Sequence, residues 1–178
     1  MRTVYYQGEK GSFSERAVRK YFGAAARSAG VRQFEDVFRA AAAGRNAFGV
    51  IPIENTLMGS IHQNYDLLLR YDLWIRGELK LRIRFQLLAR PGAGLRNLRE
   101  IWSHPAALEQ CRRFLDGRPG LKLVPVYDTA GAAKLLNRTR RKDVGIIAGP
   151  QVAQQYRLRT IEKRIEDDPR NYTRFLVL

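Results

Sequence analysis

The chain is poor in the residues that most often bind metals or form covalent intermediates. Its 178 residues include a single cysteine, Cys111, and two histidines, His62 and His104. One cysteine excludes an intrachain disulfide, which fits a reducing compartment, and the two histidines have no metal-ligand spacing. Cys111 falls on the apolar stripe of an expected helix, so we expect a core residue there rather than a nucleophile. We expect no metal.

The chain also lacks a long apolar stretch. No run approaches the roughly 20 apolar residues that a membrane helix needs, and the sequence passes from Arg2 directly into a strand-like segment at 3–6, without the apolar core of a signal peptide. We therefore expect a cytoplasmic protein without a membrane partner. The length allows one ordinary domain or two small lobes.

Acidic residues are scarce beside basic ones, with 17 Asp and Glu against 32 Lys and Arg and a net charge of +15. Such a balance can mark a nucleic-acid binder. The basic residues are scattered, however, and their densest cluster, at 138–142, follows an expected helix, where cations complement the helix dipole. We expect no specific nucleic-acid partner. The same positive field would attract a small dianion.

Strand-like and helix-like patterns alternate along the chain. They predict strands at residues 3–6, 47–53, 79–87, 101–102, 121–126, 144–148 and 172–178, and helices after residue 12, at 34–43, after residue 59, at 105–115, at 129–136 and from 151. This alternation indicates an α/β architecture. Breaks near residues 78 and 160 suggest two lobes, one of residues 1–78 plus 161–178 and one of residues 79–160.

Four hydroxyl residues stand at or just before predicted helix starts: they are Ser12, Ser60, Ser103 and Thr129. Unpaired N–H groups and the helix dipole make such positions carboxylate sites, but serine and threonine also simply cap helices there. Ser103 and Gln110 are two turns apart and would face the same side of a helix that starts near Pro105. His104 either caps that helix or contacts a ligand.

Glu54, Asn55 and Thr56 follow a predicted strand, at the carboxyl end where α/β sheets bind ligands. The Asn55 amide can both donate and accept hydrogen bonds to a ligand. An Asx turn is a strong competing use of asparagine after a strand. For Glu54 two uses stay open, an ion pair within its lobe or a hydrogen bond to a ligand hydroxyl.

The C-terminal residues 165–175 carry the densest polar pattern. Carboxylates lead into Pro169, and Thr173 and Arg174 then stand between two aromatic residues. A turn that leads into a strand is one way to present a hydroxyl and a cation to a ligand. The plain alternative is an edge strand on which both side chains face water.

Five segments in order closely resemble the signature blocks of prephenate dehydratases. They are Gly8-x-x-Gly11-Ser12-Phe13-Ser14, Val50-Ile51-Pro52-Ile53-Glu54-Asn55-Thr56-x-x-Gly59-Ser60, Ser103-His104-Pro105-x-Ala107-Leu108-x-Gln110-Cys111, Asp128-Thr129-Ala130-x-Ala132-Ala133 and Asp167-Asp168-Pro169-x-Asn171-Tyr172-Thr173-Arg174-Phe175. The resemblance implies two α/β lobes with a cleft between them, like a periplasmic binding protein, and a site in that cleft. It also implies the decarboxylating dehydration of prephenate to phenylpyruvate in L-phenylalanine biosynthesis, without a cofactor.

The resemblance also implies roles for individual residues. Thr173 would donate to the leaving hydroxide, Arg174 and helix-end amides would stabilise the charge on its oxygen, and Phe175 and Tyr172 would line an apolar ring pocket. The implied catalytic residues are Thr173, Asn55, Ser103, Gln110 and Glu54. The implied substrate-binding residues are Ser12, Thr56, Gly59, Ser60, His104, Thr129, Ala148, Arg174 and Phe175.

Other functions remain open at this stage. An arogenate dehydratase acts on the amino analogue and shares every motif, while a non-catalytic two-lobed anion-binding protein or a basic nucleic-acid module belongs to another class. Ser12 replaces the family's more frequent threonine, Asn64 a usual hydroxyl residue and Ala106 a usual glutamine, so prephenate and arogenate both stay open as substrates. We expect a homodimer without an ACT-type regulatory domain, and hence no allosteric inhibition by phenylalanine.

We predict that prephenate turnover by the purified chain survives exhaustive treatment with a chelator and needs no added nucleotide. The sequence has no metal-ligand cluster, and Gly8-x-x-Gly11 lacks the spacing of a dinucleotide fingerprint. The assay follows the absorbance of phenylpyruvate in alkali. Activity that a chelator removes and one added metal ion restores would contradict this prediction.

Overall fold

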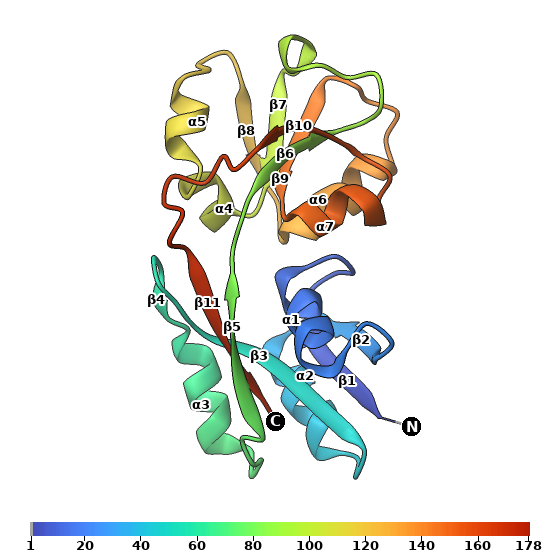
Figure 1. Cartoon of the computed structure of the whole chain (residues 1–178), viewed down its shortest axis with the longest axis vertical. Coiled ribbons are helices and arrows are strands. Elements are labelled where there is room, and N and C mark those ends of the chain that lie inside the picture. The colour runs from blue at the N-terminus through green and yellow to red at the C-terminus, as the bar shows by residue number, and fades with distance from the viewer. Residues whose placement is uncertain (1) are drawn as a thin grey trace. The chain divides into compact units, whose positions relative to one another are not determined.

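The computed structural model describes residues 2–178 and divides into two compact units (Figure 1). Unit 1 contains the described residues up to Ile83 together with Arg170–Leu178, and unit 2 contains Arg84–Pro169. The boundaries expected near residues 78 and 160 lie earlier in the chain than the observed ones, which follow Ile83 and Pro169. The difference arises because the strand before Ile83 pairs within unit 1, whereas the strand that follows residue 158 pairs within unit 2.

Unit 1 is a mixed sheet with helices on both faces. Its strands are β1 (Thr3–Gln7), β2 (Arg27–Val31), β3 (Ala47–Asn55), β4 (Gly59–Ser60), β5 (Gly77–Arg82) and β11 (Tyr172–Val177), and its helices are α1 (Phe13–Phe22), α2 (Phe34–Ala42) and α3 (His62–Arg70). The strand order is β2-β1-β3-β11-β5, with β4 paired to β3. The first three strands of this order are parallel, and β11 is antiparallel to both of its neighbours.

The two faces of this sheet are covered by different helices. Helices α2 and α3 pack on one face, where their apolar side chains form a buried cluster with Ile51, Ile53 and Leu176 of β3 and β11. Helix α1 packs on the other face, where the ring of Phe22 lies 5.3 Å from that of Phe48. Because successive side chains of a strand point to opposite faces, Arg174 shares the α3 side with Leu176, and Thr173 lies on the α1 side.

Helix α1 begins and ends as its sequence predicts. The Ser12 hydroxyl accepts a hydrogen bond from the backbone N–H of Glu15 at 3.2 Å, and Gly23 ends the helix at a φ of 88°. Only glycine adopts such a conformation without strain. The Glu15 carboxylate accepts from the N–H of Gly11 at 2.6 Å, so the capping interaction also fixes the loop before the helix.

Strand β3 passes through Pro52 instead of ending there. The register of β11 on β3 shifts between Arg174 and Phe175, so that Phe175 faces Pro52 and Arg174 faces Glu54. A proline has no N–H for the ladder, and a bulge is where a central strand tolerates one. The Pro52 carbonyl accepts instead from the side-chain amide of buried Asn64, at 2.7 Å. The bulge therefore sets the direction of the residues that follow it.

Unit 2 is a second mixed sheet, ordered β10-β6-β9-β7-β8. Its strands are β6 (Gln86–Ala89), β7 (Glu100–Ser103), β8 (Lys122–Pro125), β9 (Val144–Ala148) and β10 (Arg159–Lys163), and its helices are α4 (Pro105–Glu109), α5 (Arg112–Asp116), α6 (Thr129–Asn137), α7 (Pro150–Gln155) and the 3-10 turn η1 (Leu95–Asn97). Its core joins the alanine-rich face of α6 to Ile146 and Ala148 of β9 and to Leu88 of β6.

Two predicted elements are each divided in the structure. The predicted strand 79–87 is two strands, because β5 pairs with β11 whereas β6 pairs with β9 and β10. Its alternation still holds, since Leu81, Ile83, Phe85 and Leu87 are all buried. The predicted helix 105–115 is likewise interrupted between α4 and α5. In the part of the chain that the structure describes, no helix is long and apolar enough to span a membrane.

We predict that Asn64→Ala lowers the free energy of unfolding by roughly 1–3 kcal/mol, because it leaves the buried Pro52 carbonyl without a donor. Urea unfolding followed by circular dichroism measures the change. Gln63→Ala, at an exposed position of the same helix, is the matched control and should change stability by less than about 0.5 kcal/mol. Equal effects of the two substitutions would show that the bond to Pro52 contributes nothing.

Candidate active site

The ends of β3 and β11 bring Asn55 and Thr173 together in unit 1. The two residues are register partners, and both side chains are almost completely buried. The Asn55 side-chain nitrogen donates to the Thr173 hydroxyl oxygen at 3.0 Å and to the side-chain oxygen of Asn171 at 2.8 Å. It also lies 3.1 Å from the carbonyl of Tyr172. These bonds fix the position of the Thr173 hydroxyl.

The bonding leaves the proton of the Thr173 hydroxyl available. A threonine hydroxyl has one proton to donate and lone pairs that accept. The oxygen accepts from Asn55, and within residues 2–178 no bond donated by this hydroxyl to another protein group is found. The Thr173 hydroxyl can therefore donate its proton to a ligand while its oxygen accepts a hydrogen bond from Asn55.

The other end of the Asn55 amide shapes the chain. Its oxygen accepts from the backbone N–H groups of Leu57 and Met58, each at 3.0 Å, which is the Asx turn that competed with a ligand contact in the sequence. Because both ends of the amide bond within unit 1, Asn55 acts by positioning Thr173. The idea that Asn55 itself binds a ligand through a free amide is not supported by this bonding.

Thr56 and Gly59 build the turn beside this pair. The Thr56 hydroxyl donates to the carbonyl of Arg170 and accepts from the N–H of Tyr172, both at 3.0 Å, so it ties the end of β3 to the start of β11. Gly59, which follows the three-residue hairpin loop 56–58, has a φ of 78°, a conformation that favours glycine. Ser60 lies in β4 and not at a helix start, because α3 begins after Ile61 without a side-chain cap.

Arg174 is close to Thr173 only in sequence. It lies on the α3 side of the sheet, where its Nε donates to Glu78 at 2.8 Å and a second guanidinium nitrogen also contacts the same carboxylate oxygen. The hydrogen bond to Glu78 raises the pKa of Arg174. The hypothesis that Arg174 stabilises charge on the Thr173 oxygen is therefore wrong for this arrangement, and the Asn55 amide occupies that position.

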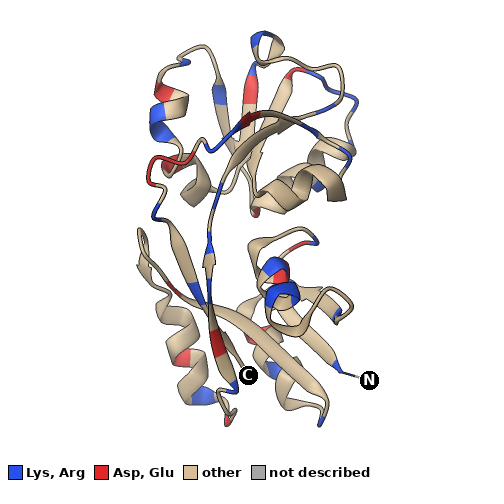
Figure 2. Ribbon diagram, in the orientation of Figure 1, with Lys and Arg blue, Asp and Glu red and all other residues tan. Residues whose placement is uncertain are grey.

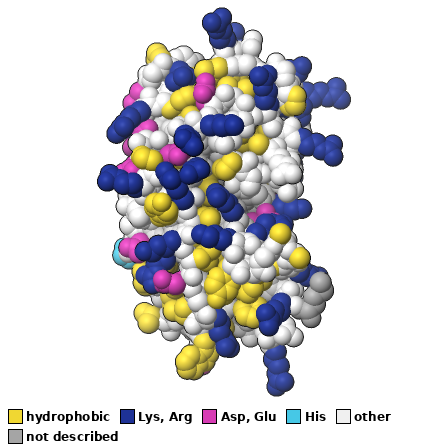
Figure 3. Space-filling model, viewed as in Figure 1, with side chains coloured by type: hydrophobic (Ala, Val, Ile, Leu, Met, Phe, Trp, Pro, Cys, Tyr) yellow, Lys and Arg dark blue, Asp and Glu magenta, His cyan; other side chains and the backbone are white. Residues whose placement is uncertain are grey.

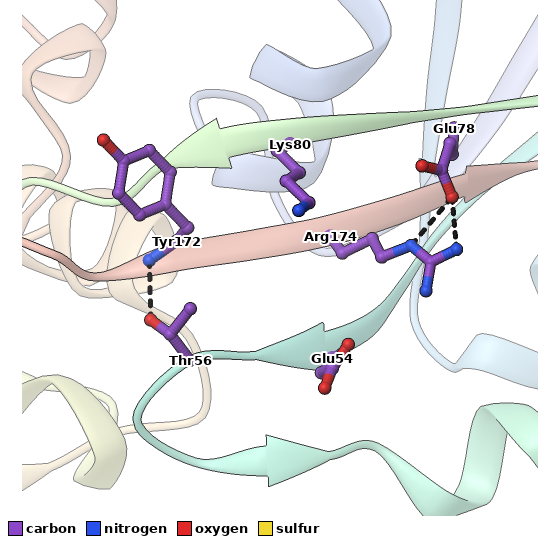
Figure 4. A pocket seen from close by; sticks show the side chains of 6 residues that line it. All are labelled: Glu54, Thr56, Glu78, Lys80, Tyr172 and Arg174. Carbon is purple, nitrogen blue, oxygen red and sulfur yellow. Dashed lines mark hydrogen bonds and ion pairs between the residues drawn. The ribbon is translucent and has the colours of Figure 1, made fainter.

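A cavity of about 510 Å³ opens on the same side as Arg174 (Figure 4). It is lined by Glu54, Thr56, Glu78, Lys80, Tyr172 and Arg174. Figure 4 shows that these side chains come from β3, β5 and β11 and that Glu54 has no dashed contact to the others. Tyr172 faces this side, whereas Phe175 is buried on the opposite side. The two aromatic residues therefore do not line one ring pocket.

In unit 2, the predicted site residues lie at or just after the ends of β7, β8 and β9. The hydroxyl of fully buried Ser103 donates to the carbonyl of Ile147 at 2.6 Å. The His104 ring nitrogen Nδ1 accepts from the N–H of Ala106 and so caps α4. The Ser103 hydroxyl thus bonds to a neighbouring strand of the sheet. Of the two roles left open for His104, the structure shows helix capping.

The remaining predicted residues of unit 2 lie at element ends. Thr129 is the first residue of α6, and the cap itself is Asp128, whose side chain accepts from the N–H of Gly131 at 2.7 Å. Ala148 is the buried last residue of β9. Gln110 is the C-cap of α4 and Ser103 ends β7, so no continuous helix aligns the two, and the predicted alignment is wrong.

Asn171, Glu166 and Asp167 have structural roles that the sequence did not predict. Fully buried Asn171 accepts from Asn55, so it belongs to the Thr173 cluster. The Asp167 carboxylate accepts from the N–H groups at the start of α5, and that of Glu166 from the N–H of Phe85. These carboxylates are therefore structural. The only available signal was their place in the C-terminal motif.

Cys111 is a core residue, as its pattern predicts. Its side chain is fully buried between α4 and α5. Burial, together with the nearby carboxylates of Asp167 and Glu166, raises the pKa of the thiol far above its usual value. A thiol that stays protonated is a poor nucleophile. No group of residues suited to a metal ion occurs among the described residues.

The fold itself defines a class of protein. A solved lipoprotein of Bacillus subtilis, 14% identical, matches 99% of this chain and 82% of its own with a TM-score of 0.50. At that identity the likeness concerns the fold alone. The two mixed α/β sheets with their helices thus form a periplasmic-binding-protein-like fold, as expected.

Within this class the chain belongs to the prephenate dehydratase family, whose model, "Prephenate dehydratase", matches residues 4–178. "Arogenate dehydratase 2" of Petunia hybrida is 44% identical over 98% of this chain and 44% of that protein. The "Bifunctional chorismate mutase/prephenate dehydratase" of Pseudomonas aeruginosa is 38% identical over 98% of this chain and 48% of that protein. The solved prephenate dehydratase of Arthrobacter aurescens in complex with L-Phe is 30% identical, with a TM-score of 0.90 over 98% of this chain and 59% of that chain. The chain spans about half the length of the curated relatives it matches.

We predict that Asn55→Asp destabilises the protein by roughly 1–3 kcal/mol at neutral pH, because an ionised carboxylate cannot donate to Thr173 or Asn171. A proton would restore one donor, so the folded state raises the pKa of the substituted carboxyl. The neutral form is then favoured below the unfolded pKa of about 3.9, and the penalty grows as the pH rises through the folded pKa.

Urea unfolding at a series of pH values measures this dependence. Asn97→Asp, at an exposed position of unit 2, is the control and should give almost no change. A penalty for Asn55→Asp that stays constant from acid to neutral pH would contradict the proposed bonding.

Proposed function

We propose that this chain is a prephenate dehydratase, which converts prephenate into phenylpyruvate for L-phenylalanine biosynthesis. Membership of the family supports the reaction class. The observation that carries the assignment is the buried Thr173 hydroxyl, whose oxygen accepts from Asn55 while its proton has no protein acceptor among the described residues. A non-catalytic binding protein gives no reason for this arrangement.

The chemistry needs little more than a positioned donor. Prephenate has a quaternary ring carbon that carries a carboxylate, and a hydroxyl across the ring. When the carbon–carboxylate bond breaks, its electron pair enters the ring, the carbon–oxygen bond breaks, and CO2, hydroxide and an aromatic ring result. Hydroxide is a poor leaving group, so a proton or a strong hydrogen bond on the departing oxygen lowers the barrier. Aromatisation supplies the driving force, and no cofactor is needed.

In this mechanism Thr173 donates to the departing hydroxide and Asn55 is the positioning residue. An ordinary threonine hydroxyl is a very weak acid, so negative charge that develops on its oxygen needs a donor. The Asn55 nitrogen, 3.0 Å from that oxygen, supplies one, and a preorganised donor of this kind acts on the transition state. The other residues that the resemblance implies, including Glu54, Ser12 and the set in unit 2, remain proposals.

Arogenate dehydratase is the second candidate. The relatives that are 44% and 43% identical are named arogenate dehydratase or arogenate dehydratase/prephenate dehydratase, whereas the bifunctional prephenate dehydratase of Pseudomonas aeruginosa is 38% identical. The ring chemistry at Thr173 is the same for both substrates. Values of kcat/KM for prephenate and for arogenate, measured on one preparation, decide between them.

We further propose that the substrate is a free dianion in the cytoplasm and that no specific nucleic acid takes part. The net charge of +15 creates a field that attracts a dianion. Added salt should therefore raise KM more than it changes kcat. Bound RNA or DNA of one preferred sequence would contradict the absence of a nucleic-acid partner.

We predict that Thr173→Val, which keeps the side-chain shape and removes the hydroxyl, lowers kcat by roughly 10²- to 10⁴-fold with little change in KM. Thr173→Ser keeps the hydroxyl and should retain most of the activity. Phenylpyruvate absorbance in alkali measures both variants. Near-normal turnover by the folded valine variant would rule out Thr173 as the donor, and a wild-type chain inactive on both substrates would rule out the proposed function.

A further inference from the structure

Four connections of unit 2 meet at one end of its sheet. Strands β7, β8 and β9 are parallel and begin there, since Glu100 is the register partner of both Lys122 and Val144. Strand β6 is antiparallel to β9 and ends there, and β10 starts beside it, with Arg159 opposite Ala89. The segments that form this end, which we name the basic end, are 90–100, 117–122, 138–143 and 157–159.

Direct contacts hold these segments together. The Arg90 guanidinium donates to the carbonyl of Asn137 at 3.4 Å, and the Asn137 side-chain nitrogen donates to the carbonyl of Tyr156 at 3.0 Å. The N–H of Arg99 donates to the carbonyl of Asp143 at 2.8 Å. Segments that lie far apart in the sequence therefore form one continuous surface of unit 2.

All of the excess positive charge of unit 2 lies at this end. The four segments contain eleven basic and two acidic residues, whereas the rest of unit 2 contains six basic and seven acidic ones. The two acidic residues, Glu100 and Asp143, both pair with Arg141. Basic residues that are scattered along the sequence are thus gathered in space. Figure 2 shows basic positions on the loops at the top of the view, which belong to unit 2.

Most of these cations are available to a partner. Eight of the basic side chains are exposed, and their charged groups have neither an ion pair nor a hydrogen bond to another described residue. They are Arg96, Arg99 and Lys122, the basic residues of 138–142 except Arg141, and those of 157–159. Figure 3 shows Lys and Arg side chains that project along the upper and right-hand margins of unit 2.

One of these arginines has a strained backbone. Arg157 follows α7 with a φ of 54°, in the left-handed region that glycine adopts with least strain. The N–H of Leu158 donates to the carbonyl of Ala153 at 2.8 Å and so ends the helix around Arg157. Glycine would form the same helix end with less strain. The charge at this position therefore carries a cost in stability that the turn alone does not explain.

Helix dipoles account for only part of the charge at the basic end. A cation complements the dipole within the last turn of a helix, which applies to Arg138 after α6 and to Arg157 after α7. Arg99, Lys122 and Arg159 stand instead at the starts of strands β7, β8 and β10. Their charges have no such partner and leave the end of the sheet strongly positive.

The arrangement fits an extended polyanion rather than a small ligand or a membrane. None of the eight side chains lines the cavities of about 510, 420 and 360 Å³ in units 1 and 2. Among the described residues, no large apolar side chain of the four segments is exposed, whereas stable binding to a membrane surface needs apolar burial besides charge. Six of the eight are arginines, whose planar forks of donors match phosphate groups.

We propose that the basic end of unit 2 binds the phosphodiester backbone of a nucleic acid duplex, whatever its base sequence. Arginine and lysine side chains neutralise phosphates and release bound counterions, which gives an affinity that falls steeply with salt. The four segments contain no aromatic residue that could stack on bases. Binding of this kind is compatible with the absence of a sequence-specific nucleic-acid partner.

The basic end is separate from the residues implied for catalysis. Ser103 and Ala148 are the last residues of β7 and β9, and Thr129 is the first of α6. The basic end lies at the opposite ends of the same three elements. Binding of a polyanion there is therefore independent of the proposed reaction, and its test does not require an active enzyme.

Fluorescence anisotropy of a labelled DNA duplex of about 20 base pairs, at about 50 to 200 mM salt, tests the proposal. The logarithm of the association constant should fall linearly with that of the salt concentration, with a slope steeper than about −2. Two duplexes of unrelated sequence should bind within about threefold of each other, because contacts to phosphates carry no sequence information.

A pair of triple variants separates the basic end from net charge. Arg140→Gln, Lys142→Gln and Arg159→Gln together should weaken binding at least about tenfold and make the salt slope shallower by about 2. The control removes three exposed cations elsewhere in unit 2, through Arg113→Gln, Lys163→Gln and Arg164→Gln, and leaves the same net charge. It should change the affinity by less than about threefold.

Arg157→Gly separates charge from folding, because it should weaken binding without lowering the melting temperature. Circular dichroism checks that every variant is folded. A wild-type chain that does not bind at low salt, a control triple variant that is weakened as much as the other, or a strong preference for one base sequence would overturn the proposal. Tighter binding to vesicles of phosphatidylserine and phosphatidylcholine than to the duplex would assign the basic end to a membrane surface instead.

Discussion

The antiparallel pairing of β11 with β3 is the contact on which the rest of the site depends. It joins Asn55 and Thr173, which are separated by 118 positions in the sequence. The pairing places the Asn55 side-chain nitrogen 3.0 Å from the Thr173 hydroxyl oxygen and so fixes the position of that buried hydroxyl. The C-terminal strand therefore completes unit 1 and also carries Thr173, the hydroxyl proposed as the donor.

The pleat of β11 places its polar residues Thr173 and Arg174 on opposite faces of the sheet. Thr173 lies on the α1 side and Arg174 on the α3 side, where it pairs with Glu78. A sequence shows such residues as neighbours, yet successive side chains of a strand point in opposite directions. A Thr-Arg pair in a strand is thus two separate features, a buried donor and a surface ion pair. The exposed pair contributes little to stability by itself.

Much of the fold followed from the sequence, and the failures have physical causes. Strands with buried faces, and helix α1 with its Ser12 cap, carry clear periodicity or capping signals. Strands β2 and β10 were missed because both lie at sheet edges and contain no buried residue, so their sequences lack an apolar pattern. The site was only partly predictable, since the motif named Asn55 and Thr173 but could not show that Asn55 bonds to Thr173 rather than to a ligand.

The bonding of Asn55 explains why this position demands an amide. Its oxygen holds the turn to Met58 while its nitrogen holds Thr173 and Asn171. A serine is too short to form both sets of bonds, and an aspartate accepts but does not donate when ionised. An unpaired buried polar group costs about 1–3 kcal/mol, so the bonds of the Asn55 amide stabilise the turn as well as orient the Thr173 hydroxyl. The Asn55 side chain therefore both stabilises the turn and preorganises the Thr173 hydroxyl. A substitution at this position preserves both effects only if the new side chain is a primary amide of the same length.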